Sequence, residues 1–164
     1  MTSLATCLWF DGDAEAAARL YTSLLPDSRI DRVVLAPADN PSTKQGEVLT
    51  VDFTLAGQRL TALNGGPDFR FTEAISLVIE CEDQAEVDRL WTSLILGGGE
   101  PGPCGWLKDR FGLSWQIVPR QLNEMLAGPD AEGAKRVMEA MLQMGKLDLA
   151  RLREAYQGEP VRTV

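Results

Sequence analysis

The residues best suited to covalent chemistry in this sequence are its three cysteines, Cys7, Cys81 and Cys104. A thiol becomes a good nucleophile when a nearby base or cation stabilises its thiolate, and Lys108 and Arg110 follow Cys104 closely. The chain contains no histidine, so neither a Ser-His-Asp triad nor a Cys-His pair can form. Cys7 and Cys104 are therefore either nucleophiles without an imidazole base or thiols without a catalytic role, and both interpretations stay open.

The absence of histidine also removes the commonest ligand for zinc, iron and nickel. A metal site would have to use carboxylates, thiolates or amides. The formal charge of −8 argues against nucleic-acid binding, which needs lysine and arginine to neutralise phosphates. No apolar run approaches the roughly 20 residues of a membrane span, and Asp11 interrupts the N-terminal segment too early for a signal peptide. With an odd number of cysteines, these features predict a cytoplasmic protein with no nucleic-acid or membrane partner.

Two segments of the chain repeat each other at an offset of 70 residues. Residues 19–25 (RLYTSLL) match residues 89–95 (RLWTSLI), and upstream the apolar run 7–9 falls on 77–79. Asp13 falls on Asp83, and each is suited to cap the helix that follows. The repeat predicts a strand followed by a helix in both halves.

Strand-like segments follow each predicted helix. In the first half residues 29–36 form one candidate strand, and residues 46–55 and 58–63 form a hairpin around Ala56-Gly57. In the second half the hairpin joins residues 105–108 to 113–118. When the two hairpins are aligned on Gly57 and Gly112, Thr61 in the first half corresponds to Gln116 in the second. The sequence thus predicts an α+β fold of two βαβββ modules.

The remaining residues, 121–164, read as helical. Pro129 and Asp130 open a helix whose apolar positions recur at helical spacing, and Gly145 ends that stretch. We expect a tandem domain over 1–120, with modules at about 1–66 and 72–120. We expect the helical extension to pack on the domain or on a second protomer.

Several short phrases resemble a known family. They are CLWFDG at 7–12, LNGGP at 63–67, CGWLKDRFG at 104–112 and SWQIVP at 114–119. With the duplicated βαβββ order, they resemble the PhnB-like (demethylubiquinone methyltransferase-like) subgroup of the vicinal-oxygen-chelate (glyoxalase/bleomycin-resistance) superfamily. The resemblance implies two half-barrels, each curved around a cleft, and a homodimer.

The resemblance also implies where metal ligands would lie, on the first and last strands of each half. Those positions match Thr6, Ser76, Thr61 and Gln116. A shift of one residue in the first strand would turn Cys7 inward in place of Thr6. Neutral hydroxyl and amide groups bind divalent ions poorly without a carboxylate or imidazole. We therefore expect no metal and no cofactor.

The candidate pocket residues come from these positions and from the quoted phrases. Trp106 begins a strand where it can meet a ligand or pack, and the polar residues can face a pocket or bond to backbone. The full set is Thr6, Cys7, Leu8, Thr61, Asn64, Ser76, Cys104, Trp106 and Gln116.

These expectations favour a metal-independent protein that binds an unidentified small molecule. One alternative is a lyase, isomerase or dioxygenase of the same superfamily. Others are a methyltransferase-like protein, as the subgroup's older naming implies, and a dimeric scaffold for a protein partner. Whether the chain is an enzyme stays open.

Overall fold

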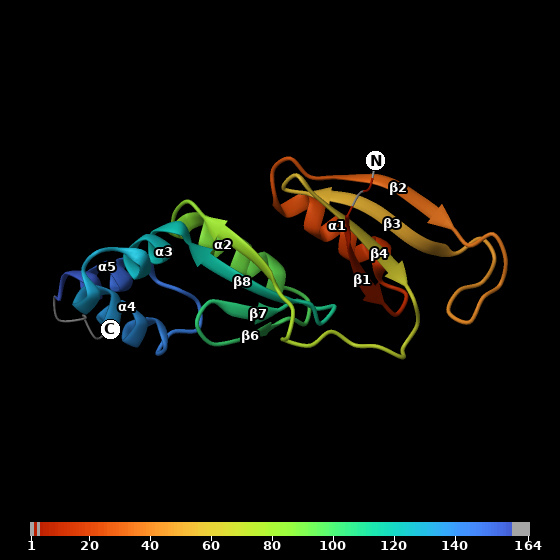
Figure 1. The fold of residues 1–164 in the computed structure, drawn as a ribbon. Coiled ribbons are helices and arrows are strands. Elements are labelled where there is room, and N and C mark those ends of the chain that lie inside the picture. The colour runs from red at the N-terminus through yellow and green to blue at the C-terminus, as the bar shows by residue number, and fades with distance from the viewer. Residues whose placement is uncertain (1, 3, 159–164) are drawn as a thin grey trace. The chain divides into compact units, whose positions relative to one another are not determined.

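The structure is a computed structural model that describes residue 2 and residues 4–158. The chain divides into two compact units, Met1–Phe71 and Thr72–Val164, called here the first and second units. Each unit holds one of the predicted modules, and the helical extension belongs to the second (Figure 1). Residues 159–164 of the predicted extension lie outside the described residues.

The first unit has the predicted βαβββ order. Its elements are β1 (Thr6–Phe10), α1 (Ala14–Leu24), β2 (Arg29–Leu35), β3 (Val48–Leu55) and β4 (Gln58–Asn64). The strands form one sheet in the order β1-β4-β3-β2, in which β1 runs parallel to β4 and the other pairs are antiparallel. The parallel pair needs a crossover, and α1 supplies it.

The second unit repeats this topology. Its elements are β5 (Leu77–Cys81), α2 (Gln84–Ile95), β6 (Glu100–Pro101), β7 (Trp106–Lys108) and β8 (Ser114–Pro119). The sheet order β5-β8-β7-β6 matches that of the first unit strand for strand. The predicted βαβββ order includes the short strand β6, but its residues were not located, because two residues that include a proline carry no strand pattern.

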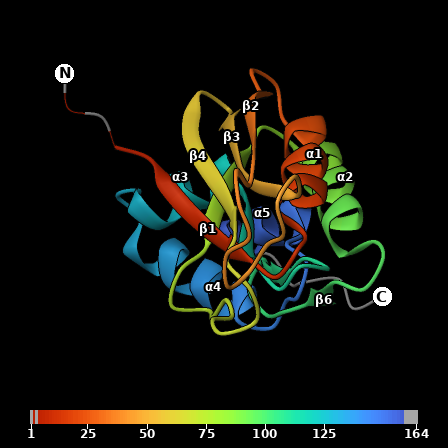
Figure 2. The same ribbon diagram turned by 90° about the vertical axis from the view of Figure 1, so that its right-hand side faces the viewer.

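One face of each sheet is covered by the unit's own helix (Figures 1 and 2). In the first unit Ala17 and Tyr21 of α1 are fully buried, and the Tyr21 ring lies 6.4 Å from the Phe53 ring of β3. Neighbouring side chains along a strand alternate between faces, so the intervening residues project from the opposite side. We call that opposite side the open face of each unit.

The two crossover helices begin differently. Asp83 caps α2 as predicted, because its carboxylate accepts the Glu86 N–H at 2.9 Å. Asp13 makes no such bond. The first N–H of α1, at Ala14, instead donates to Asn64 Oδ1 from the end of β4, at 2.9 Å. The predicted Asp13 cap is therefore replaced by a residue distant in sequence.

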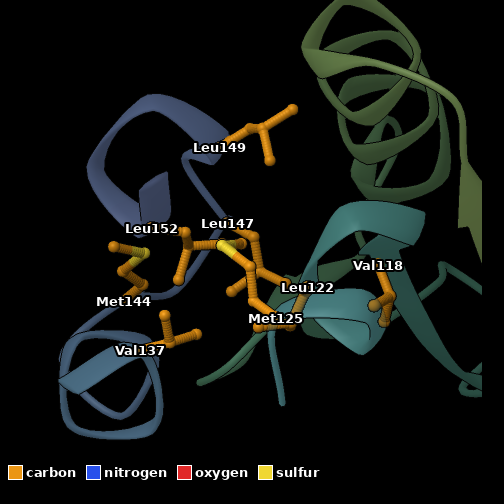
Figure 3. Packing of buried hydrophobic residues seen from close by; sticks show 8 residues of the cluster. All are labelled: Val118, Leu122, Met125, Val137, Met144, Leu147, Leu149 and Leu152. Atoms are coloured by element: carbon orange, nitrogen blue, oxygen red, sulfur yellow. The ribbon is translucent and has the colours of Figure 1, made fainter. Parts of the chain in front are cut away.

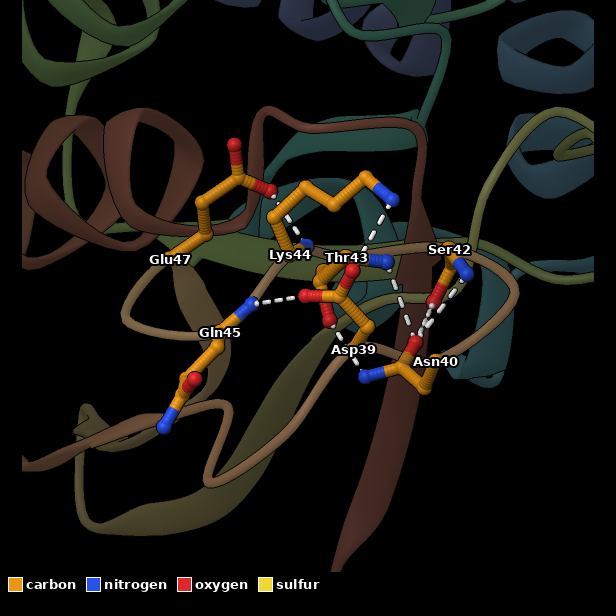
Figure 4. Close-up of polar contacts among 7 residues, drawn as sticks. All are labelled: Asp39, Asn40, Ser42, Thr43, Lys44, Gln45 and Glu47. Carbon is orange, nitrogen blue, oxygen red and sulfur yellow. Dashed lines mark hydrogen bonds and ion pairs between the residues drawn. The ribbon is translucent and has the colours of Figure 1, made fainter.

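The loop between β2 and β3 is held by its own side chains (Figure 4). Asn40 Oδ1 accepts the backbone N–H groups of Ser42 and Thr43, and Asp39 accepts the N–H of Gln45. The Ser42 hydroxyl donates to the carbonyl of Asn64 at 2.9 Å. This last bond ties the loop to the same residue that caps α1.

The extension forms α3 (Arg120–Ala127), α4 (Ala131–Met141) and α5 (Leu149–Gln157). A cluster of buried apolar side chains joins them to the end of β8 (Figure 3): Val118, Leu122, Met125, Val137, Met144, Leu147, Leu149 and Leu152. The Gln84 side chain of α2 bonds the carbonyl of Leu147 and the N–H of Leu149. The extension thus packs within the second unit, and a second protomer against it stays a prediction.

Within the described residues, no helix combines the length and apolar character needed to cross a membrane.

Candidate functional site

A row of polar side chains crosses the open face of the first unit. Strand register places Cys7 of β1 beside Thr61 of β4, Thr61 beside Asp52 of β3, and Asp52 beside Arg32 of β2. Paired residues on adjacent strands project from the same face. The four side chains therefore lie abreast across the sheet.

Asp52 is the centre of this row. Its Oδ1 accepts the Thr61 hydroxyl at 2.7 Å, and its Oδ2 pairs with the Arg32 guanidinium at 2.6 Å. The Thr61 hydrogen bond, with help from Arg32, lowers the pKa of the Asp52 carboxyl below its usual value. Asp52 is therefore an ionised acceptor at neutral pH and is poorly suited to act as a general base there.

A hollow of about 710 Å³ lies beside the row. Its charged lining consists of three arginines and three aspartates: Arg29, Arg32, Arg59, Asp27, Asp31 and Asp52. Arg29 pairs with Asp31 at 2.8 Å, as Arg32 pairs with Asp52. Among the described residues Arg59 makes no ion pair, and its side chain is exposed. Arg59 can therefore offer its guanidinium to a ligand.

The open face of the second unit has a different row. Val78 of β5 pairs with Gln116 of β8, which pairs with Trp106 of β7. Gln116 donates from Nε2 to the Ser76 hydroxyl at 2.9 Å. The structure thus brings three predicted site residues, Ser76, Trp106 and Gln116, onto one face.

A hollow of about 380 Å³ lies at the β6–β7 side of this face. It is lined by Glu73, Glu100, Pro101, Gly102, Pro103, Trp106, Leu107, Lys108 and Ser114. Lys108 pairs with Glu73 at 2.6 Å. Trp106 is thus the predicted residue that lines this second hollow.

The sequence offset of 70 is wrong by one residue at the first strands. Residues 11–13 join β1 to α1, whereas only residues 82–83 join β5 to α2. The strands therefore correspond at an offset of 71, and Cys7 matches Val78. Ser76 lies on the open face, but Thr6 pairs with Leu60 on the helix-covered face. The register agrees with the one-residue alternative: Cys7, in place of Thr6, lies on the open face beside Thr61.

Two other predicted pocket residues also lie away from the open face. Leu8 is 3% exposed on the side covered by α1. Asn64 is buried, bonds Ala14 N–H, and donates to the Val48 carbonyl at 2.9 Å. Both residues stabilise the first unit from within its core.

The cysteines are poorly prepared for nucleophilic attack. Cys7 is exposed as a whole residue, but partial burial of its thiol removes water that would stabilise the thiolate and so raises the pKa of that thiol. Burial raises the pKa of Cys81 to about 12. Cys104 is half-buried in a loop, and both cations near it in sequence are engaged, Lys108 with Glu73 and Arg110 over the Phe111 ring. The surroundings of Cys7 and Cys81 therefore disfavour a thiolate.

The open-face positions do not fit a divalent metal. Cys7, Val78, Thr61 and Gln116 offer one thiol, one hydroxyl and one amide, and Thr61 already donates to Asp52. Nowhere among residue 2 and residues 4–158 do three or more histidine, cysteine, aspartate or glutamate side chains gather as a possible metal site. Hard divalent ions need several charged or imidazole ligands together.

Sequence reasoning missed Arg32, Asp52 and Arg59. A usable signal was present in β3, where Thr50, Asp52 and Thr54 alternate with buried Val51 and Phe53. Such alternation marks a polar strand face. It does not reveal that charges from two further strands meet on that face.

Comparison with known proteins places this architecture in a family. The family model described as 3-demethylubiquinone-9 3-methyltransferase matches residues 2–118. A solved PhnB protein from Bacillus cereus, titled a putative 3-demethylubiquinone-9 3-methyltransferase, is 32% identical, with a TM-score of 0.60 over 72% of this chain and 99% of that one. A comparison with curated proteins gave no match.

More distant structures share the fold alone. Protein PA1353 from Pseudomonas aeruginosa is 18% identical, with a TM-score of 0.55 over 73% of this chain and 98% of that one. The fosfomycin resistance protein FosX from Mesorhizobium loti is 16% identical, with a TM-score of 0.52 over 77% of this chain and 98% of that one. The predicted resemblance is confirmed: this chain belongs to the PhnB-like family described as 3-demethylubiquinone-9 3-methyltransferase, within the vicinal-oxygen-chelate superfamily.

Proposed function

We propose that this chain is a metal-independent protein that binds a small molecule on the open faces of its half-barrels. The observation that carries the proposal is the row Cys7–Thr61–Asp52–Arg32 beside a hollow of about 710 Å³. Convergent polar groups at the edge of a concavity are typical of ligand sites. The chemistry of these side chains suits hydrogen bonding and ion pairing better than metal coordination.

The charges that line the first hollow balance, and Arg59 is the lining guanidinium that can contact a ligand with an anionic group. Two of its arginines already pair with aspartates, whereas Arg59 has no ion pair among the described residues. A guanidinium binds carboxylate or phosphonate oxygens with two parallel hydrogen bonds. We infer that Arg59 makes the first contact with such a group.

The first test is the metal content of untagged protein by mass spectrometry, because a histidine tag would supply the ligands that this chain lacks. We expect well under stoichiometric zinc, nickel, iron or manganese. Small carboxylates and phosphonates should then raise the melting temperature equally with and without a chelator. Stoichiometric metal, with binding lost in the chelator, would overturn the proposal.

A matched pair of variants locates the binding. Arg59→Gln removes the guanidinium that has no ion pair and should lower the affinity for small carboxylates and phosphonates about tenfold. Arg70→Gln makes the same charge change in the first unit at an exposed residue outside the hollow, and should leave binding unchanged. Equal loss in both variants would indicate non-specific attraction of anions and would contradict the assignment.

The family description gives a second candidate, methyl transfer. The strand-to-helix connections are short and acidic, Asp-Gly-Asp at 11–13 and Glu-Asp at 82–83, and neither resembles a glycine-rich nucleotide loop. We therefore expect no heat of binding when S-adenosylmethionine is titrated into the protein. A saturable heat at one site per chain would favour the methyltransferase over the binding protein.

We also propose that the protein is cytoplasmic, as its composition indicates, and that it is a homodimer, as the family resemblance implies. Light scattering during size-exclusion chromatography should give about twice the chain mass of 18.0 kDa. A monomer at micromolar concentration would contradict this assembly.

A further inference from the structure

The second unit contains a buried hydroxyl without a hydrogen-bond partner. Ser114 is 1% exposed, and its Oγ makes no hydrogen bond to any described residue. Ser114 is two residues from Gln116 on β8 and pairs with Lys108, so its side chain belongs to the open face. Buried hydroxyls in native proteins are almost always bonded, so an orphan of this kind needs a cause.

Ser114 lines the hollow of about 380 Å³ beside β6 and β7. Half of the other lining residues are apolar: Pro101, Pro103, Trp106 and Leu107. Trp106 is half-buried, and its indole N–H has no bond among the described residues. The hollow thus combines aromatic and proline surfaces with two uncommitted hydrogen-bonding groups.

The backbone at Gly102 lies close to Trp106. Gly102 N–H donates to the Trp106 carbonyl at 2.8 Å. A Cβ at Gly102 would lie 2.9 Å from that carbonyl oxygen, closer than real side chains come. The glycine therefore lets the strand approach Trp106 tightly and fixes one wall of the hollow.

The charges around the hollow select against anions. Glu73 and Glu100 face a single cation, Lys108, which is already paired with Glu73 at 2.6 Å. An anionic ligand would meet a surplus negative charge, whereas a neutral ligand would not. This is the reverse of the first unit, where an arginine is available.

We propose that this hollow binds a neutral aromatic ring that carries a carbonyl or hydroxyl oxygen. The ring lies against Trp106 and the two prolines, and its oxygen bonds the Ser114 hydroxyl. This assignment rests on the proposed function and names the ligand class for the second unit.

The test uses benzamide as the probe on the full chain, with binding followed by saturation-transfer NMR and by tryptophan fluorescence. Ser114→Ala should lower the affinity for benzamide at least fivefold, because the amide oxygen of the ligand loses its buried hydrogen-bond partner. The melting temperature of the Ser114→Ala variant should stay the same or rise, since the removed hydroxyl had no hydrogen-bond partner among the described residues. Trp106→Leu should abolish detectable binding.

Three controls complete the design. Ser93→Ala changes a half-buried serine of α2 outside the hollow and should bind benzamide as the unaltered protein does. In the Arg59→Gln variant, which lacks the carboxylate contact proposed for the first hollow, benzoate (anionic) and cyclohexanecarboxamide (non-aromatic) should bind far more weakly than benzamide. Equal binding of benzamide by Ser114→Ala, or a lowered melting temperature in that variant, would overturn the assignment.

Failure of this inference can be separated from failure of the proposed function. If benzamide does not bind but carboxylates still bind through Arg59, the ligand class of the second hollow is wrong and the proposed function stands. If neither probe binds, the proposed function itself fails.

Discussion

At the scale of single residues, the cysteines differ mainly in how far each sulfur is withdrawn from water. Cys81 is fully buried with a pKa of about 12, so it should stay unreactive toward a disulfide reagent until the protein unfolds. Cys7 should react at pH 7.5 more slowly than free cysteine, because its raised pKa leaves less thiolate. Labelling rates measured with a Cys7→Ser variant for assignment check both statements. A Cys104 rate far above that of Cys7 would instead revive the nucleophile hypothesis.

Asp52 gives a pH dependence with a defined sign. Its folded pKa is lowered, so the bonds to Thr61 and Arg32 stabilise the protein fully above the unfolded value of about 3.9. That contribution is lost as the pH falls through the lower folded value. Asp52→Asn should therefore cost about 1 kcal/mol of unfolding free energy at pH 7, and the cost should shrink in more acidic solution.

Urea unfolding at pH 7 and at about pH 3 checks the Asp52 prediction. Asp68→Asn, at an exposed aspartate with no ion pair or hydrogen bond among the described residues, is the control and should change little at either pH. A cost for Asp52→Asn that is independent of pH would show that the ionised carboxylate is not the stabilising group.

The candidate site could be predicted only in part from residue types. Ser76, Gln116 and Trp106 were found because repeat and motif placed them on sheet strands. Arg32 and Asp52 were missed because charged residues on a strand look solvated until the register of three strands is known. Side-chain pairing across a sheet is set by long-range register, which single-sequence patterns do not contain.

At the scale of elements, the end of β4 controls the start of α1. Asn64→Ala removes the partner of both Ala14 N–H and the Val48 carbonyl inside the protein, and should cost about 2 kcal/mol of unfolding free energy. Asp13→Ala is the control, since Asp13 makes no capping bond, and should cost far less. Equal losses in denaturant unfolding would contradict this division of roles.

The order of strands and helices was predictable because both halves carry the same local signals. Apolar periodicity identified α1 and α2, and Ala56-Gly57 identified the first hairpin turn, where both residues have positive φ (47° and 81°). The register of β1 was ambiguous because a connection can gain one residue without disturbing the helix pattern. Local signals therefore determine the elements, whereas the lengths of the connections decide which strand residues face which side.

At the scale of the whole molecule, the helical extension gives the second unit a larger core. Leu152 is fully buried in the cluster that joins α5 to β8, so Leu152→Ala should cost about 3 kcal/mol. Hydrogen exchange should then increase first in residues 118–158. Leu96→Ala, at a leucine 68% exposed, should change stability by less than about 0.5 kcal/mol. Faster exchange confined to residues 4–71 would contradict this prediction.

The unequal connections before α1 and α2 have a consequence for engineering this scaffold. A designer who transplanted imidazole and carboxylate groups by aligning the helices would choose Thr6, and the new side chain would enter the core against α1. Placed at Cys7 and Thr61, the same groups would stand side by side on the exposed face of adjacent strands. A metal site could then be installed on the open face of the first unit. This requires that the two units be aligned by their first strands, β1 with β5, and not by their helices, α1 with α2.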